Sequence, residues 1–216
     1  MRKNITIPEL QRTLLDIYDV PDDQLYTIED ILYYNQKYIL NFLHDLSADN
    51  IKEAKSDLTV SLAWFVALVS RYHLDLPEII WKRYAYKCPF CLEIPCFCKD
   101  FESRKAKKTG RPSSRKPQKI IEWQKMVEKI YPKSNIETLK YLLPHVLDEL
   151  NHSVRVFLRK REKKSFKDIE INTADYFIIL LRIYNYFNVD IAKYFWQMFG
   201  RGCYVCHRTP CICNYY

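Results

Sequence analysis

The stretch Cys88-Pro-Phe-Cys-Leu-Glu-Ile-Pro-Cys-Phe-Cys98 has a counterpart with the same cysteine spacing, Cys203-Tyr-Val-Cys-His-Arg-Thr-Pro-Cys-Ile-Cys213. The copies lie 115 residues apart, and together they use all eight cysteines of the chain. A proline precedes the third cysteine in each copy, at Pro95 and Pro210. The pattern indicates a metal site, and it sets the register of an internal repeat.

Four cysteines within so short a stretch can surround one tetrahedral Zn²⁺, because thiolate ligands at about 2.3 Å require a tight turn. We expect two structural zinc ions, since four thiolates leave no coordination position open for a substrate. His207 is an alternative ligand that a complete shell does not need, and an iron–sulfur cluster is the alternative metal group. The predicted ligands are Cys88, Cys91, Cys96, Cys98, Cys203, Cys206, Cys211 and Cys213.

The composition favours an all-α fold. The 216 residues are 48% hydrophobic but include only three glycines, which argues against glycine-rich phosphate loops and turn-rich sheets. The N-terminus lacks the apolar segment of a secretory signal, so we expect a cytoplasmic protein with reduced thiols. The most apolar stretch, residues 58–70, is too short to span a bilayer, and we expect no membrane association.

The cysteine offset also aligns Trp81 with Trp196 and Asp75 with Asp190. We therefore predict two tandem four-helix modules that pack as a pseudo-dimer, within a monomer or a homodimer. Each cysteine cluster should hold the C-terminal tail of its module against that module's own bundle, each aspartate should cap the following helix, and Pro144 should kink or split its helix. The predicted modules are residues 1–102 and 120–216, joined by a linker at 103–119. Predicted helices cover roughly 7–18, 27–47, 51–73, 76–85, 119–130, 135–161, 168–187 and 191–199.

The linker is strongly basic and contains no acidic residue. Its charge equals the net charge of the chain, +8. One interpretation is a solvated connection, and the other is an arm that binds nucleic acid or another polyanion through its phosphates. The basic residues are Arg104, Lys105, Lys107, Lys108, Arg111, Arg115, Lys116 and Lys119.

Two predicted helices of the second module carry polar residues at helical spacing. Glu149 and His152 are three residues apart and share one helix face, as do Asn172 and Asp175 on the next helix. If the helices pack antiparallel, their ligand atoms converge, as in helical bundles that bind divalent metals. The four residues are a candidate Mg²⁺ or Mn²⁺ site, and the alternative is a set of polar surface residues.

The run from Asn172-Thr-Ala-Asp175 to Asn188-Val-Asp190-Ile resembles the E-L-A-D helix and G-I-D-L turn of the MazG-like, all-α nucleoside triphosphate pyrophosphohydrolases. In that family, E-x-x-E and E-x-x-D pairs on successive helices hold Mg²⁺. Hydrolysis releases pyrophosphate and a nucleoside monophosphate. The resemblance covers both modules and implies a nucleotide substrate and catalytic roles for Glu149 and Asp175, with His152 and Asn172 contributing ligation or orientation.

The chain departs from the four carboxylates of that family. His152 and Asn172 replace two of them, and these ligands suit Mn²⁺ better than Mg²⁺. Three hypotheses remain open: a pyrophosphohydrolase with a reduced site, a degenerate relative that binds a nucleotide or a partner without hydrolysis, and a zinc-binding scaffold for nucleic acid or protein. The aligned positions of the first module, a degenerate copy of the site, are Phe42, Asp45, Asp57 and Val60.

Overall fold

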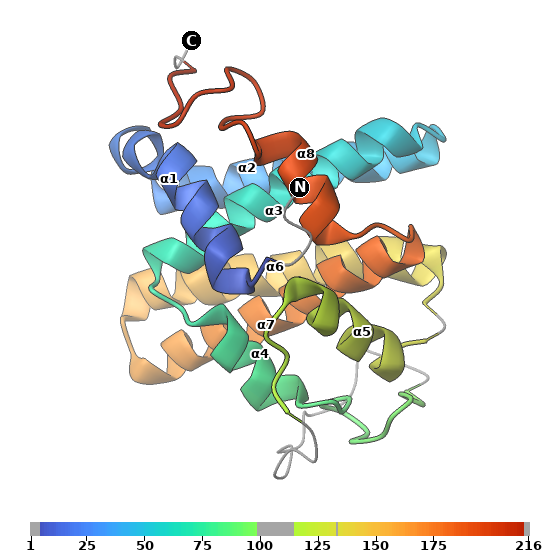
Figure 1. Cartoon of the computed structure of the whole chain (residues 1–216). Coiled ribbons are helices and arrows are strands. Elements are labelled where there is room, and N and C mark those ends of the chain that lie inside the picture. Colours follow the sequence, from blue (N-terminus) through green and yellow to red (C-terminus); the bar gives the residue numbers. More distant parts are fainter. Residues whose placement is uncertain (1–4, 99–114, 133, 214–216) are drawn as a thin grey trace. The chain divides into compact units, whose positions relative to one another are not determined.

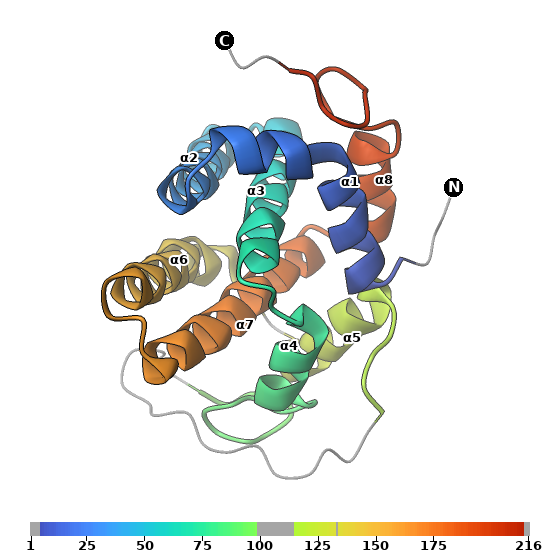
Figure 2. The ribbon, with the colours of Figure 1, turned by 90° about the vertical axis from the view of Figure 1, so that its left-hand side faces the viewer.

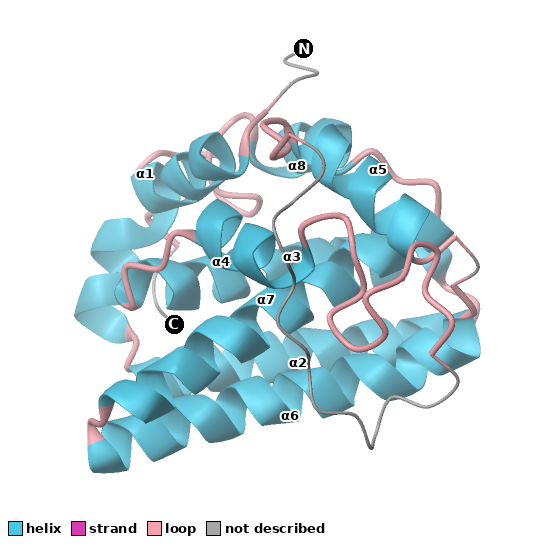
Figure 3. Ribbon diagram, turned by 90° about the horizontal axis from the view of Figure 1, so that it is seen from below, coloured by secondary structure: helices cyan, strands magenta, loops and turns pink. Residues whose placement is uncertain are grey.

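The computed structural model describes residues 5–98, 115–132 and 134–213. Within these residues the chain forms eight α-helices and no strand (Figure 3), which confirms the predicted all-α class. The cysteine-rich stretches are loops that follow two of the helices. No helix in the described ranges combines the length and the apolar character that crossing a lipid bilayer requires.

The chain divides into two compact units that do not follow the order of the sequence. Unit 1 contains Met1–Leu74 and Ile191–Tyr216, and unit 2 contains Asp75–Asp190. The chain thus passes from unit 1 into unit 2 after the third helix and returns just before the last. Each unit is described by itself below.

Unit 1 is built on a helical hairpin of α2 (Ile28–Ser47) and α3 (Ile51–Arg71), which lie along each other in Figures 1 and 2. Helix α1 (Ile7–Leu25) packs on α3, and α8 (Ile191–Phe199) contributes Phe199, whose ring contacts Tyr18 edge-on at 6.2 Å. The start of α2 is set locally by Thr27 and Asp30. The Asp30 backbone N–H donates to the Thr27 hydroxyl (3.2 Å), and the Thr27 N–H donates to the Asp30 carboxylate (2.9 Å).

Unit 2 repeats this plan with a hairpin of α6 (Ile136–Lys160) and α7 (Lys163–Tyr186). Helices α4 (Leu76–Tyr84) and α5 (Ile120–Ile130) both pack on α7. Asp75 caps α4 as predicted, accepting a hydrogen bond of 3.0 Å from the Glu78 N–H. Pro144 lies inside α6, which continues past it, so the helix is not split and the predicted kink stays a prediction.

The compact units do not coincide with the predicted modules. Helix α4 and the first cysteine stretch, from the first module, belong to unit 2, whereas α8 and the second stretch, from the second module, belong to unit 1. Each cysteine stretch, together with the short helix before it, is therefore grouped with helices of the other sequence copy, whereas we expected only its own copy. Packing between helices decides which unit α4 and α8 join, because the short connections after α3 and α7 do not themselves fix the choice of bundle. The origin of the repeat by tandem duplication stays a prediction.

Candidate metal centres

Each cysteine stretch gathers its four sulfur atoms into one cluster. All eight cysteines are free thiols, and within each cluster the four Sγ atoms lie within 4.8 Å of one another. The Sγ atoms of Cys88 and Cys98 are 3.8 Å apart, and those of Cys203 and Cys213 are 3.7 Å apart. A tetrahedron with Zn–S bonds of about 2.3 Å has edges of about 3.8 Å. Both clusters therefore have the dimensions of a four-thiolate metal site, as the spacing predicted.

The backbone shapes the two clusters in the same way. In the first, the Leu92 N–H donates to the Cys88 carbonyl at 2.9 Å, and in the second His207 donates to Cys203 at 2.8 Å. Leu92 and His207 both adopt left-handed backbone angles, with φ of 65° and 56°. The His207 side chain is exposed and is not part of the cluster, so the four cysteines suffice as ligands.

The outermost thiol of each cluster ionises easily. Burial opposes the charge on Cys91, but hydrogen bonds from the Glu93 and Phe97 backbone and from neighbouring thiols lower its pKa to about 7. Burial likewise opposes the charge on Cys206, and hydrogen bonds from the Ile212 and Arg208 backbone lower its pKa to about 6. Since metals bind thiolates rather than thiols, one ligand of each cluster is prepared for binding near neutral pH.

Equivalent contacts dock both clusters onto a helix. The Cys96 N–H donates to the Ile130 carbonyl at the end of α5 (2.8 Å), and the Cys211 N–H donates to the Ile17 carbonyl in α1 (2.7 Å). In unit 2, the hydroxyl of Tyr131 also donates to the Cys88 sulfur at 3.7 Å. A metal ion in either cluster would therefore clasp the C-terminal tail of one repeat to the first helix of the other.

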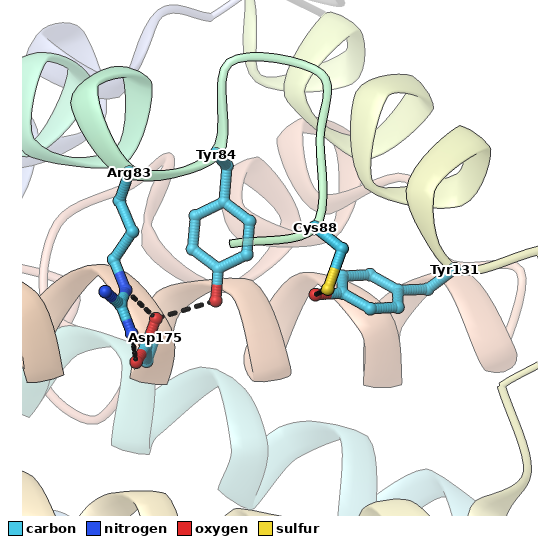
Figure 4. Close-up of polar contacts among 5 residues, drawn as sticks. All are labelled: Arg83, Tyr84, Cys88, Tyr131 and Asp175. Carbon is cyan, nitrogen blue, oxygen red and sulfur yellow. Dashed lines mark hydrogen bonds and ion pairs between the residues drawn. The ribbon is translucent and has the colours of Figure 1, made fainter. Parts of the chain in front are cut away.

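Asp175, one of the predicted catalytic carboxylates, is held by two side chains of α4 (Figure 4). Arg83 forms a two-pronged ion pair with it, Nε to Oδ1 and Nη2 to Oδ2, and the Tyr84 hydroxyl donates to Oδ1 at 2.7 Å. The side chains of Arg83 and Asp175 are only 13% and 14% exposed. Burial opposes the charge on Arg83, but Asp175 raises the pKa of Arg83, so the guanidinium stays charged. Sequence reasoning missed the roles of Arg83 and Tyr84, and the only signal was a pair of basic residues, Lys82 and Arg83, in the last turn of the helix.

The other three residues of the predicted Mg²⁺ or Mn²⁺ site do lie together. Glu149, His152 and Asn172 line a surface pocket of about 270 Å³ between α6 and α7, with Asp168 as an acidic neighbour that the sequence pattern missed. The Asn172 amide donates to the Glu149 backbone carbonyl at 3.0 Å, so its side chain is already engaged. Asp175 is not among the lining residues. Within the described residues, only the cysteine clusters bring three or more His, Cys, Asp or Glu ligand atoms close together.

In the degenerate copy, Phe42 and Val60 are buried in unit 1. The two remaining carboxyls, Asp45 and Asp57, interact with each other. Burial raises the pKa of Asp57 to about 6, helped by the charge of Asp45, a hydrogen bond with it, and the charge of Glu53. Asp57 is thus protonated in mildly acidic solution, and a protonated carboxyl is a poor ligand for a metal ion.

Most of the basic linker lies outside the described residues, including Arg104, Lys105, Lys107, Lys108 and Arg111. At its end, Lys116 forms an ion pair with Glu78 of α4 at 2.9 Å, and Lys119 directly precedes α5. Arg115 is exposed. Nucleic-acid binding by this segment stays a prediction.

In comparisons with known proteins, no family model, curated protein or solved structure matches the chain.

Proposed function

We propose that the chain is a zinc-stabilised helical binding protein, a divergent MazG-like fold that has lost hydrolysis. One Zn²⁺ in each four-cysteine cluster is structural, because four thiolates complete its coordination and leave no site for a substrate. The size of the clusters and the low pKa of Cys91 and Cys206 support this role.

The Arg83–Asp175 ion pair is the main support for the proposed loss of hydrolysis. In the second module, only Glu149 and Asp175 keep a carboxylate at the positions that would hold Mg²⁺. A carboxylate that already accepts three hydrogen bonds from Arg83 and Tyr84 has little capacity left for a cation. Glu149 alone is too weak a ligand set for Mg²⁺, which is usually bound by carboxylates together with substrate phosphates and water.

A pyrophosphate-release assay tests this proposal. The purified chain is incubated with a panel of nucleoside triphosphates in Mg²⁺ and in Mn²⁺, and its zinc content is measured on the same sample. We expect about two zinc ions per chain and no pyrophosphate above the buffer blank. Pyrophosphate release that disappears in Glu149→Gln would contradict the proposed loss of hydrolysis. A chain that folds without zinc would contradict the proposed structural role of the metal.

An active pyrophosphohydrolase is the second candidate, and the pocket of Glu149, His152 and Asn172 favours it. In that case Glu149 and His152 would hold Mn²⁺ or Mg²⁺ together with phosphate oxygens of the nucleotide, and the metal would supply activation of water. The pocket is open on the surface, and both Glu149 and His152 are exposed. Loss of release in Glu149→Gln, but not in Glu137→Gln, a matched exposed glutamate on the same helix, would assign the activity to this pocket.

A further inference from the structure

A second pocket lies within unit 1, beside the cysteine cluster of residues 203–213. Its volume is about 200 Å³, somewhat more than the roughly 150 Å³ of an apolar cavity that accepts benzene. Three cysteines of the cluster form part of its wall. The rest is mainly aromatic, with contributions from Tyr18, Tyr26, Tyr34, Tyr38, Tyr204 and Trp64. We call this site the aromatic pocket.

The aromatic rings hold one another in place. Tyr34 and Trp64 stack with ring centroids 4.8 Å apart and planes 14° apart, and Tyr26 meets both rings edge-on at 5.4 and 5.1 Å. Across the pocket, the hydroxyls of Tyr38 and Tyr204 are hydrogen-bonded at 3.2 Å. All five side chains are half-buried and line the pocket.

The charge around the aromatic pocket is negative. No Lys, Arg or His is among its lining residues. With Zn²⁺ bound, the four thiolates of the cluster carry a net charge of about −2. Two cations lie at the edge of the pocket: Lys37 Nζ is 5.8 Å from the Tyr34 ring centroid, and the Arg71 guanidinium donates to the Tyr26 backbone carbonyl at 3.4 Å. An anionic ligand such as a nucleotide phosphate would be repelled.

Unit 2 carries a cation at the matching positions. There the Arg83 guanidinium lies 5.8 Å from the Phe90 ring centroid and is paired with Asp175. At the cysteine offset, unit 1 has Met198, Val205 and Val60 in place of Arg83, Phe90 and Asp175. Val60 and Val205 both line the aromatic pocket, so the positions of Asp175 and Phe90 in unit 2 correspond to apolar wall residues of this pocket in unit 1.

We propose that the aromatic pocket binds an organic ammonium ion, with a methylated ammonium group as the simplest form. Aromatic faces attract such cations by about 0.5 to 2 kcal/mol each, and more when the cation is desolvated. The thiolate cluster supplies a complementary charge, and in this respect the inference rests on the proposed zinc. The ligand chemistry is shared by small choline-like molecules and by methylated lysine side chains.

Calorimetric titration of the zinc-loaded full chain tests the inference, with choline as the probe. Its neutral isostere 3,3-dimethyl-1-butanol has the same shape but no charge. We expect saturable choline binding and roughly tenfold weaker binding of the isostere, equivalent to about 1.4 kcal/mol. Tighter binding of trimethyllysine amide than of choline would identify a protein side chain as the source of the cation, and the reverse a small molecule.

Variants assign the binding to the aromatic pocket. Trp64→Leu and Tyr34→Leu should each weaken choline binding about 2- to 30-fold. The control is Tyr141→Leu, which removes an exposed aromatic of unit 2 and should change nothing. If Trp64→Leu does not fold, Tyr34→Leu alone decides the question.

Equal affinity for choline and its isostere, or no saturable choline binding by a sample that holds zinc, overturns the inference. A chain that folds without zinc and still binds choline would contradict the structural zinc and leave this inference standing. The zinc content of each sample therefore separates the two failures.

Discussion

The two units share one plan but fill its interior differently. In unit 2, Arg83 pairs with Asp175, and a second buried arginine, Arg182, lies 4.4 Å from the Tyr131 ring centroid. At the cysteine offset, unit 1 has only small or apolar residues in these places, such as Val60 and Ala67, and it contains the aromatic pocket. The difference shows that one helical plan with similar cysteine clusters can place an internal ion pair in one unit and an aromatic pocket in the other.

The largest effect should come from the cysteine clusters, and it tests which helices each cluster holds. Cys211→Ser should destabilise unit 1, and Cys96→Ser should destabilise unit 2, each by at least about 4 kcal/mol, because a structural metal site is lost. Denaturant unfolding measures the loss. Hydrogen exchange should then quicken in α1 for Cys211→Ser and in α5 for Cys96→Ser. Faster hydrogen exchange in α5 for Cys211→Ser and in α1 for Cys96→Ser would contradict the docking of each cysteine cluster on the first helix of the other sequence copy.

The ion pair of unit 2 gives the next largest effect. Arg83→Met leaves Asp175 largely buried without its cation and should cost about 3 kcal/mol of unfolding free energy. The double variant Arg83→Met/Asp175→Val installs the residues of unit 1 and should recover most of the loss, since a well-packed apolar pair can replace a buried ion pair. Urea unfolding measures both.

Lys82→Met is the matched control on the same helix. Its partner Glu78 is 3.7 Å away and the lysine is 69% exposed, so the change should stay below about 0.5 kcal/mol. A cost for Arg83→Met as small as that of the control would show that the pair contributes nothing beyond a surface contact.

A smaller effect concerns the carboxyl pair of unit 1. Asp57 has a pKa of about 6 in the folded chain against 3.8 for the free group, because of burial and then Asp45. The folded state binds the proton more tightly, so stability from this group is present at low pH and is lost as the pH rises through about 6. Asp57→Asn should therefore stabilise the chain by about 1 kcal/mol at pH 7.5, after allowance for solvent screening, and by less at pH 5.

Unfolding in urea at the two pH values measures this effect. Asp148→Asn is the control, because Asp148 is an exposed carboxyl on α6. The interpretation fails if Asp57→Asn gives the same change in stability at both pH values.

The smallest change in stability should come from moving the ion pair of unit 2 into unit 1. Val60→Asp/Met198→Arg fills the aromatic pocket with an internal cation, and it should alter unfolding free energy by within about 1 kcal/mol because ion and apolar pairs of similar size nearly balance. Choline binding should be lost. Calorimetric titration of this variant with choline tests whether the interiors of units 1 and 2 are equivalent. An unchanged choline affinity would show that they are not.

Much of the fold follows from local patterns in the sequence. The hydrophobic periodicity and scarcity of glycine predicted the helices, and the cysteine spacing predicted both clusters, because a four-thiolate site within eleven residues depends almost entirely on nearby backbone. Three residues of the predicted Mg²⁺ or Mn²⁺ site also lie together, since Glu149 and His152 share a helix face and Asn172 lies on the adjacent hairpin helix.

Long-range packing decided the rest. Asp175 faces Arg83, 92 positions earlier in the chain, rather than Glu149, and no local pattern records which distant side chain reaches it. The carbonyls of Ile17 and Ile130 receive the cluster of the other sequence copy, so the repeat predicts that the clusters exist but not where they dock. In unit 1, Met198 and Val60 stand where unit 2 has Arg83 and Asp175. These positions meet only after folding, so the sequence alone does not show the aromatic pocket. The sequence alone therefore specified the helices and the cysteine clusters. Tertiary contacts specified which helix each cluster contacts and which side chain pairs with Asp175.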